Sequence, residues 1–389
     1  MAKNKNIILV LFWFVVFIAI AAVLIEQYYM DNSEFYAQKP FKFTIDTDMD
    51  GYSSEIEILL SLDLMDITYP QKYELDCEGD GLYELKNITY GGVACQYKRH
   101  TGNHQIWLRG DILGLRLCPV VGSNSTSVIS IDDWGDFEWK SMEGFASDCL
   151  NLKRIPETAP NLNHVQNMSG MFARAKSFNQ PLNHWNVSGV KTMKGMFQDA
   201  TSFNQPLNNW DVSNVTTMES MFHGATSFNQ PLDNWNVSNV TDMSRMFRST
   251  PFNQPLEKWD VSNVTDMSQM FLDNKAFNQP LEEWDVSNVT DMSLIFYNAT
   301  SFNQPIEKWN VSNVTDMSQM FLDATSFNQP LDKWDVSHVV RMERMFFGAK
   351  SFSYYPKDWV VPESVDQKGM FKESQFLGFV WRHPLKTHK

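Results

Sequence analysis

The sequence predicts a mixed α/β chain, with an apolar helix at the N-terminus, a small all-β domain, and a solenoid of short parallel strands and helices. Three observations support this: a charge-free N-terminal run, a middle segment of strand-like stretches, and a repeat of 25 residues that fills the second half. With 389 residues, of which 43% are hydrophobic, the chain can bury a large core. Lys+Arg 32 against Asp+Glu 46 gives a net charge of −14, which argues against nucleic acid and anionic lipid as partners.

The N-terminal run covers residues 7–25 and contains no charged residue. As a helix it would be about 28 Å long, enough to cross the core of a bilayer. Lys3 and Lys5 precede it, so the positive-inside rule predicts a single-pass membrane protein with a cytoplasmic N-terminus and an extracellular or periplasmic ectodomain. The alternative is a cleaved signal peptide, because residues 19–21 have the A-x-A shape of a cleavage site.

The four cysteines agree with export, because an even number in an oxidising compartment indicates disulfides. They are Cys77, Cys95, Cys118 and Cys149. Four cysteines allow three pairings, and proximity favours Cys77 with Cys95 and Cys118 with Cys149. Their spacing is not typical of a zinc site.

The segment between residue 41 and about residue 130 predicts a small β domain. Turn signals at Gly79-Asp80-Gly81 and Gly91-Gly92 separate its strand-like stretches. These stretches are residues 41–45, 73–76, 83–89, 94–97, 105–109 and 113–117.

The repeat is marked by one phenylalanine and one tryptophan that recur every 25 residues. One unit, residues 202–226, reads SFNQPLNNWDVSNVTTMESMFHGAT. A single residue is missing before Phe252, which predicts a local irregularity there. The marker residues are Phe178, Phe203, Phe228, Phe252, Phe277, Phe302, Phe327 and Phe352, and Trp185, Trp210, Trp235, Trp259, Trp284, Trp309, Trp334 and Trp359.

Each unit predicts a strand in its first half and a helix in its second half. Residues 210–212 alternate as in a short strand, whereas Val215, Met218, Met221 and Phe222 recur at helical spacing. A unit this short cannot bury its aromatic residues alone, so it must stack on copies of itself. Four units place an aspartate where a carboxylate would complement the helix dipole, at Asp242, Asp266, Asp291 and Asp316.

These units resemble the bacterial surface leucine-rich repeats called BspA-like, in which NVT-x-M-x-x-MF is followed by FNQPL-x-x-W. The resemblance covers residues 134–371 and implies an extracellular or envelope leucine-rich-repeat solenoid used in binding and adhesion. The string YELDCEGDGLYELKNIT, residues 73–89, is similar to a polycystic-kidney-disease-type immunoglobulin-like domain, which implies a β-sandwich acting as a spacer. The expected organisation is a cytoplasmic tail (1–6), a transmembrane anchor or signal sequence (7–25), a linker (26–40), an immunoglobulin-like β-sandwich (41–130), an N-terminal cap with a degenerate repeat (131–176), the leucine-rich-repeat solenoid (177–371) and a C-terminal tail (372–389).

A candidate calcium loop lies near the start of the β domain. Asp46, Asp48, Asp50 and Glu57 follow the D-x-D-x-D-G spacing in which alternate carboxylates face one cation. The alternative is an acidic solvated turn, because residues 41–45 predict a strand where a calcium loop of this type follows a helix. Calcium is the one cofactor that the sequence suggests.

Partner recognition is expected where the units differ, in the two residues before each tryptophan. If they face a partner, they form an acidic stripe that suits a basic or polar one; the alternative is an ordinary solvated face. The recurring tryptophans predict a buried stack rather than a sugar platform, and the Asn-Gln pairs predict an internal amide ladder rather than a ligand site. The candidate partner-binding residues are Glu257, Lys258, Glu282, Glu283, Glu307, Lys308, Asp332 and Lys333.

No catalytic motif is present: the sequence lacks G-x-S-x-G, a phosphate-binding glycine-rich loop and H-E-x-x-H, so it predicts no enzyme. We expect a membrane-anchored bacterial surface or envelope protein that recognises or adheres to a host or neighbouring-cell surface protein, matrix or glycan. The alternatives are a structural envelope protein that self-associates and a carbohydrate-binding surface module.

Overall fold

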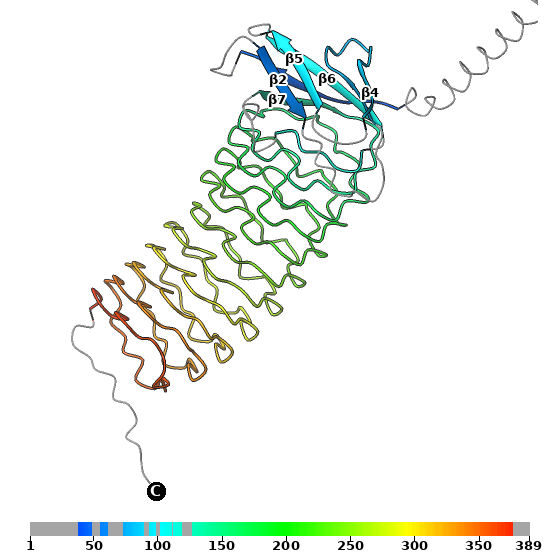
Figure 1. Ribbon diagram of the computed structural model, residues 1–389. Helices are drawn as coiled ribbons and strands as arrows, with labels where there is room; N and C mark the ends of the chain where they lie inside the picture. The colour runs from blue at the N-terminus through cyan, green and yellow to red at the C-terminus, as the bar shows by residue number, and fades with distance from the viewer. Residues whose placement is uncertain are drawn as a thin grey trace, which may run out of the picture.

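The computed structural model describes residues 38–48, 55–60, 73–88, 93–98, 102–110, 112–118 and 127–375. Figure 1 shows an elongated stack of rungs with the β-strands gathered at one end. The chain enters the stack beside the strands and runs along it, so residue number and position along the solenoid rise together.

In the described residues, seven strands form two antiparallel sheets. One sheet has five strands in the order β4-β3-β6-β1-β7, and the other pairs β2 with β5. Five expected strands are confirmed as β1, β3, β4, β5 and β6, whereas residues 113–117 form no strand and β2 and β7 were not expected. The bounds are β1 Phe41–Asp46, β2 Glu55–Leu60, β3 Tyr73–Asp76, β4 Leu85–Ile88, β5 Val93–Lys98, β6 Asn103–Gly110 and β7 Val128–Trp134.

Strand β7 joins the five-stranded sheet to the solenoid. It pairs with β1 on one side, and on the other side Ser130 forms a parallel bridge with Arg154 of the first rung. Near this junction the rings of Trp139 and Phe145 pack edge to face, with their centroids 5.5 Å apart. One continuous hydrophobic core runs from the sheet into the rungs. The sheet therefore covers the N-terminal end of the solenoid rather than forming the separate immunoglobulin-like sandwich that was expected.

The expected helix in each rung is wrong, and with it the mixed α/β class: the described residues contain no helix. Ser220 and Gly224 have positive φ angles of 58° and 70°, and the corresponding pairs in other rungs do the same. Two left-handed residues four positions apart interrupt any helix. Alternate N–H groups bond to the next rung instead, as Phe222 does to the carbonyl of Met246 at 3.0 Å, while the residues between them close tight turns.

The expected strand at each Leu-x-x-Trp-x-Val segment is also absent. The N–H of Trp210 bonds back to the carbonyl of Leu207 at 3.1 Å, which makes this segment a turn. Strand-like pairing between rungs is limited to one parallel bridge per rung, and it lies in the half that was assigned to a helix, as between Asp266 and Asp291. Each rung is therefore a closed series of turns, held to its neighbours by backbone hydrogen bonds.

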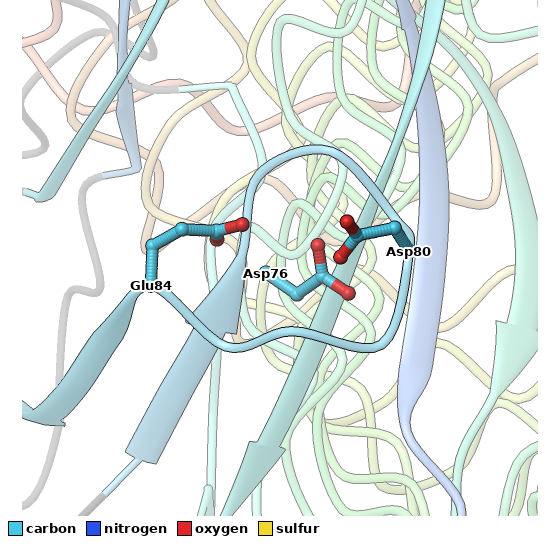
Figure 2. A group of neighbouring side chains, drawn as sticks. All are labelled: Asp76, Asp80 and Glu84. Atoms are coloured by element: carbon cyan, nitrogen blue, oxygen red, sulfur yellow. The ribbon is translucent and has the colours of Figure 1, made fainter.

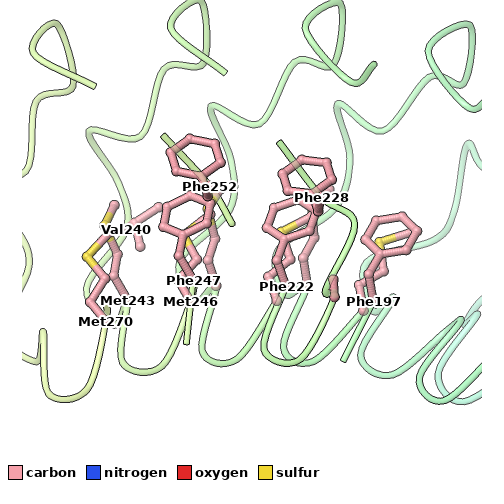
Figure 3. Close-up of a cluster of buried hydrophobic side chains, with 14 of the residues drawn as sticks. Phe197, Phe222, Phe228, Val240, Met243, Met246, Phe247, Phe252 and Met270 are labelled. Atoms are coloured by element: carbon pink, nitrogen blue, oxygen red, sulfur yellow. The ribbon is translucent and has the colours of Figure 1, made fainter. Parts of the chain in front are cut away.

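The core consists of in-register stacks of like side chains, as Figure 3 shows for Phe197, Phe222 and Phe247. The centroids of the Phe222 and Phe247 rings are 5.9 Å apart with nearly parallel planes, and Phe228 stacks on Phe222 within the same rung at 3.9 Å. Every recurring tryptophan is at most 6% exposed, so the expected buried stack is confirmed.

The membrane localisation needs correction. Across the described part of the chain, no helix is both long and apolar enough to cross a membrane. The span expected at residues 7–25 lies outside the described residues. A single-pass anchor therefore has no support from the structure.

Candidate functional site

The eight candidate partner-binding residues, here called the charged stripe, lie on an exposed turn that recurs in each rung. The turn closes when the tryptophan N–H bonds to the leucine or isoleucine carbonyl three residues earlier, as Trp284 does with Leu281 at 3.1 Å. Because that turn recurs in register, the stripe residues of successive rungs lie side by side. Glu283 and Lys333 are 72% and 70% exposed, so the stripe faces solvent.

Lysines of the charged stripe pair with carboxylates of the preceding rung. Lys308 Nζ lies 2.7 Å from Glu283 and 3.5 Å from Glu282, and Lys333 Nζ lies 3.1 Å from Glu307. The hydrogen bond to Glu283, together with the charge of Glu282, raises the pKa of Lys308. These exposed pairs contribute little to stability, but they offset part of the stripe's negative charge.

The acidic character extends beyond the stripe to the whole middle of the solenoid. Residues 252–340 carry thirteen acidic and four basic side chains, a net charge of −9. The rungs on either side are nearly balanced, with six acidic and seven basic residues in 140–226 and five acidic and six basic in 341–375. Negative charge is therefore concentrated on the central rungs.

Some of this charge comes from aspartates that directly follow the tryptophans. The Oδ1 of Asp260 accepts the N–H of Ser262 at 3.1 Å and its hydroxyl at 2.6 Å. These two hydrogen bonds lower the pKa of the Asp260 carboxyl, and Ser337 does the same for Asp335. Both carboxylates therefore stay ionised well into the acidic range.

Further charge comes from a feature that the sequence interpretation missed, here called the aspartate column. Asp242, Asp266, Asp291 and Asp316 were expected at helix starts but are joined by successive parallel bridges, so their carboxyls line up along four rungs. Burial, followed by the charges of Asp291 and Asp242, raises the pKa of Asp266. At the end of the column, Asp316 pairs with Arg341 at 2.5 Å. Aspartate recurring at one repeat position was the available signal.

The expected calcium loop is not brought together in the described residues. Asp46 ends β1 and accepts the N–H of Asp48 at 2.9 Å, whereas Glu57 lies in β2, in the other sheet. Asp50 lies outside the described residues. Calcium binding at these positions stays a prediction.

A different trio of carboxylates meets in the turn after β3. Asp76, Asp80 and Glu84 place oxygens within 4.8 Å of one another (Figure 2). Asp76, which is fully buried, already accepts the N–H groups of Gly79 at 2.6 Å and Gly81 at 2.7 Å. Oxygen ligands of this kind suit calcium, but the hydrogen bonds alone account for the positions of these side chains.

The cysteines pair as proximity favours. Cys77 and Cys95 form one disulfide and Cys118 and Cys149 the other, and the described residues contain no free cysteine. The second disulfide ties the segment before β7 to the first rung, so it strengthens the junction between sheet and solenoid. Two disulfides indicate an oxidising compartment.

The family comparison matches the solenoid. The model for "Mycoplasma protein of unknown function, DUF285" matches residues 140–251, 232–311 and 279–378. No curated protein and no solved structure matches the chain. Neither the leucine-rich repeat nor the polycystic-kidney-disease-type domain expected from the sequence is confirmed. Because the matches cover more than half of its residues, the chain belongs to the DUF285 family of Mycoplasma repeat proteins, a surface-repeat family of the BspA-like kind.

Proposed function

We propose that this protein is a binding protein of an oxidising compartment, whose solenoid recognises a basic protein partner through the acidic rungs 252–340. The partner class suggested by the sequence, a surface or matrix protein of a host or neighbouring cell, fits this proposal. The observation that carries it is the concentration of negative charge on central rungs whose cores match those of the balanced rungs beside them.

The solenoid suits such a role for physical reasons. Its core positions repeat the same side chains, so they offer no variation that could select a partner. The exposed positions do vary, and stacking in register turns that variation into a continuous surface. Excess charge of one sign on such a surface attracts an oppositely charged partner over several ångströms and speeds their association.

The test compares two full-length variants that lose the same number of carboxylates. The stripe variant carries Glu257→Gln, Glu282→Gln, Glu283→Gln and Glu307→Gln. The control variant carries Glu157→Gln, Asp358→Asn, Glu363→Gln and Glu373→Gln, which are exposed carboxylates outside the acidic rungs. Both are screened with the wild type against matrix proteins and glycans by surface plasmon resonance, and their folds are compared by circular dichroism.

We expect saturable binding of basic proteins that weakens at least ~10-fold in the stripe variant, by the loss of several ~1 kcal/mol contacts, and is retained in the control. Raising the salt concentration from about 50 to 150 mM should weaken wild-type binding, since exposed charges are screened. Equal loss in both variants, or binding of glycans that ignores both sets of changes, would refute the proposal.

A further inference from the structure

The solenoid contains one break in its register, at the rung that has lost a residue. Phe228 and Phe252 are 24 residues apart, whereas the other recurring phenylalanines are 25 apart. The residue is lost from the surface loop that reads Ala-Thr-Ser in the preceding rung and here is reduced to Thr250-Pro251. The expected irregularity is therefore present, and it is confined to one loop.

Two buried polar side chains support the shortened loop. The hydroxyl of Thr250 donates to the carbonyl of Phe247 at 2.7 Å, in place of the backbone turn formed in other rungs. In the next rung Asn274, fully buried where other rungs carry alanine, donates Nδ2 to the carbonyl of Phe252 at 2.9 Å. Its Oδ1 accepts the N–H groups of Ala276 and Phe277. A buried amide is tolerated only when its hydrogen bonds are satisfied, so Asn274 is adapted to the shortened loop.

The shortened loop leaves an open hollow of about 540 Å³ on the solenoid surface, here called the notch. Thr226 of the preceding rung forms one wall, and Asp273 and Lys275 of the following rung form the other. Ser249, Thr250 and Pro251 of the shortened loop, together with Ala276, complete the lining.

The notch presents hydrogen-bond acceptors that lack donors. In earlier rungs the equivalent carbonyls of Lys176 and Thr201 accept hydroxyl groups from the next rung. Within the described residues nothing donates to the carbonyl of Thr226; the carbonyl of Thr300, in an ordinary rung, is open too, but only that of Thr226 borders the notch. The Oδ1 of Asp273 accepts a hydrogen bond from Nδ2 of Asn298 at 2.7 Å, which leaves the second carboxylate oxygen available to a ligand. A ligand for this hollow therefore needs several N–H donors and an apolar stem.

We propose that the notch receives one arginine side chain of the basic partner. The guanidinium group supplies donors for both the Thr226 carbonyl and the Asp273 carboxylate, and its methylene stem packs on Pro251 and Ala276. Lys275 is exposed, so its ammonium group can turn away into solvent. This inference rests on the proposed function, because it specifies how the basic partner is held.

The notch also solves a problem that a periodic surface creates. Rungs 252–340 repeat nearly the same charges, so a basic segment could shift by one rung with little loss of attraction. The notch belongs to the one shortened loop, at the start of the acidic rungs, and removes that degeneracy, because only one register places an arginine in it. The acidic rungs would supply attraction, and the notch would set the register.

The test uses the full chain with threonine-methyl labels and N-acetyl-arginine amide as the probe. A repaired variant replaces residues 249–251 with the Gly-Ala-Thr-Ser of residues 224–227 and adds Asn274→Ala, which restores the ordinary rung and removes the notch. The Thr226 methyl signal is followed by NMR during titration. N-acetyl-lysine amide and the uncharged N-acetyl-citrulline amide are titrated in parallel.

We expect a saturable shift of the Thr226 signal with the arginine amide, at least ~10-fold weaker affinity for the other two amides, and no saturable shift in the repaired variant. Asp273→Asn should also weaken binding in the unrepaired chain. No saturable shift, an equal response to lysine, or the same shift in the repaired variant would overturn the proposal. If the notch fails these tests while the stripe variant still loses its partner, the proposed function stands without it.

Discussion

At the scale of single residues, the aspartate column shows how one residue type meets opposite environments at equivalent positions. Asp266 lies between two other aspartates, and burial together with their charges raises its pKa. Asp316 lies at the end of the column, where Arg341 neutralises it at 2.5 Å. An aspartate at the same repeat position therefore opposes folding in the rung of Asp266 and supports it in the rung of Asp316.

The substitution Asp266→Asn should stabilise the protein at neutral pH. A carboxyl whose folded-state pKa is raised above its unfolded value weakens folding once it is ionised, and that cost is lost as pH falls through the folded pKa. We expect the unfolding temperature of Asp266→Asn to exceed that of the wild type by about 1–2 °C at pH 7. The difference should vanish near pH 3, where the aspartate is protonated and, like asparagine, uncharged.

Asp316→Asn provides the matched control, because it removes a partner of Arg341 from the same column. Its unfolding temperature at pH 7 should fall rather than rise. A decrease for both variants would show that the asparagines disturb the rung itself and that repulsion within the column is negligible.

At the scale of one rung, the indole groups act as ties to the preceding rung. Trp284 donates Nε1 to the carbonyl of Leu256 at 3.0 Å, and the other tryptophans from Trp210 to Trp359 do the same with their predecessors. Trp185 begins this series, and its buried Nε1 has no hydrogen-bond partner among the described residues.

Trp284→Phe and Trp185→Phe therefore separate the hydrogen bond from the packing of the ring. Both indoles are at most 3% exposed, so both substitutions lose similar apolar area. We expect Trp284→Phe to cost about 1 kcal/mol more in the free energy of unfolding, because it removes a buried hydrogen bond to the carbonyl of Leu256, which keeps only the N–H of Trp259 as a donor. Denaturant unfolding measures both values, and equal costs would mean that this hydrogen bond adds no net stability.

The secondary structure of the rung was harder to predict from sequence than its core. A series of turns and an α-helix both place Val215, Met218, Met221 and Phe222 on one side, so hydrophobic spacing alone does not distinguish them. Glycine inside the supposed helices, as at Gly195 and Gly224, was the contrary signal, because it costs up to about 1 kcal/mol there relative to alanine. The register of the repeat, by contrast, predicts which side chains stack whatever the backbone between them does.

The amide ladder was predictable for the same reason. Asn204 Oδ1 accepts the N–H of Asn229 at 3.0 Å and Gln230 Nε2 at 3.1 Å, and the pattern recurs along the rungs. The charged stripe could likewise be placed from sequence, but its ion pairs across rungs depend on side-chain geometry. The notch required the structure, because the sequence shows a missing residue and not the acceptors that its absence exposes.

At the scale of the whole molecule, a stack in which each rung contacts its neighbours should tolerate the loss of a rung only where the new neighbours are equivalent. Deleting residues 302–326 removes 25 residues and brings two ordinary rungs together. Deleting residues 228–251 removes 24 residues, including Thr250, which Asn274 contacts from the next rung at 3.4 Å. The two deletions are similar in length but leave different junctions.

We expect the 302–326 deletion to keep the circular dichroism spectrum and to unfold in a single transition. The 228–251 deletion should be less stable than this by about 1 kcal/mol, because the buried Asn274 loses its contact with the Thr250 hydroxyl and faces an ordinary rung, although its other hydrogen bonds remain. Adding Asn274→Ala to the 228–251 deletion should recover most of that difference, whereas the same substitution in the full chain should destabilise. If Asn274→Ala has the same effect in both backgrounds, Asn274 is not adapted to the shortened loop, and the notch is an incidental gap in the stack.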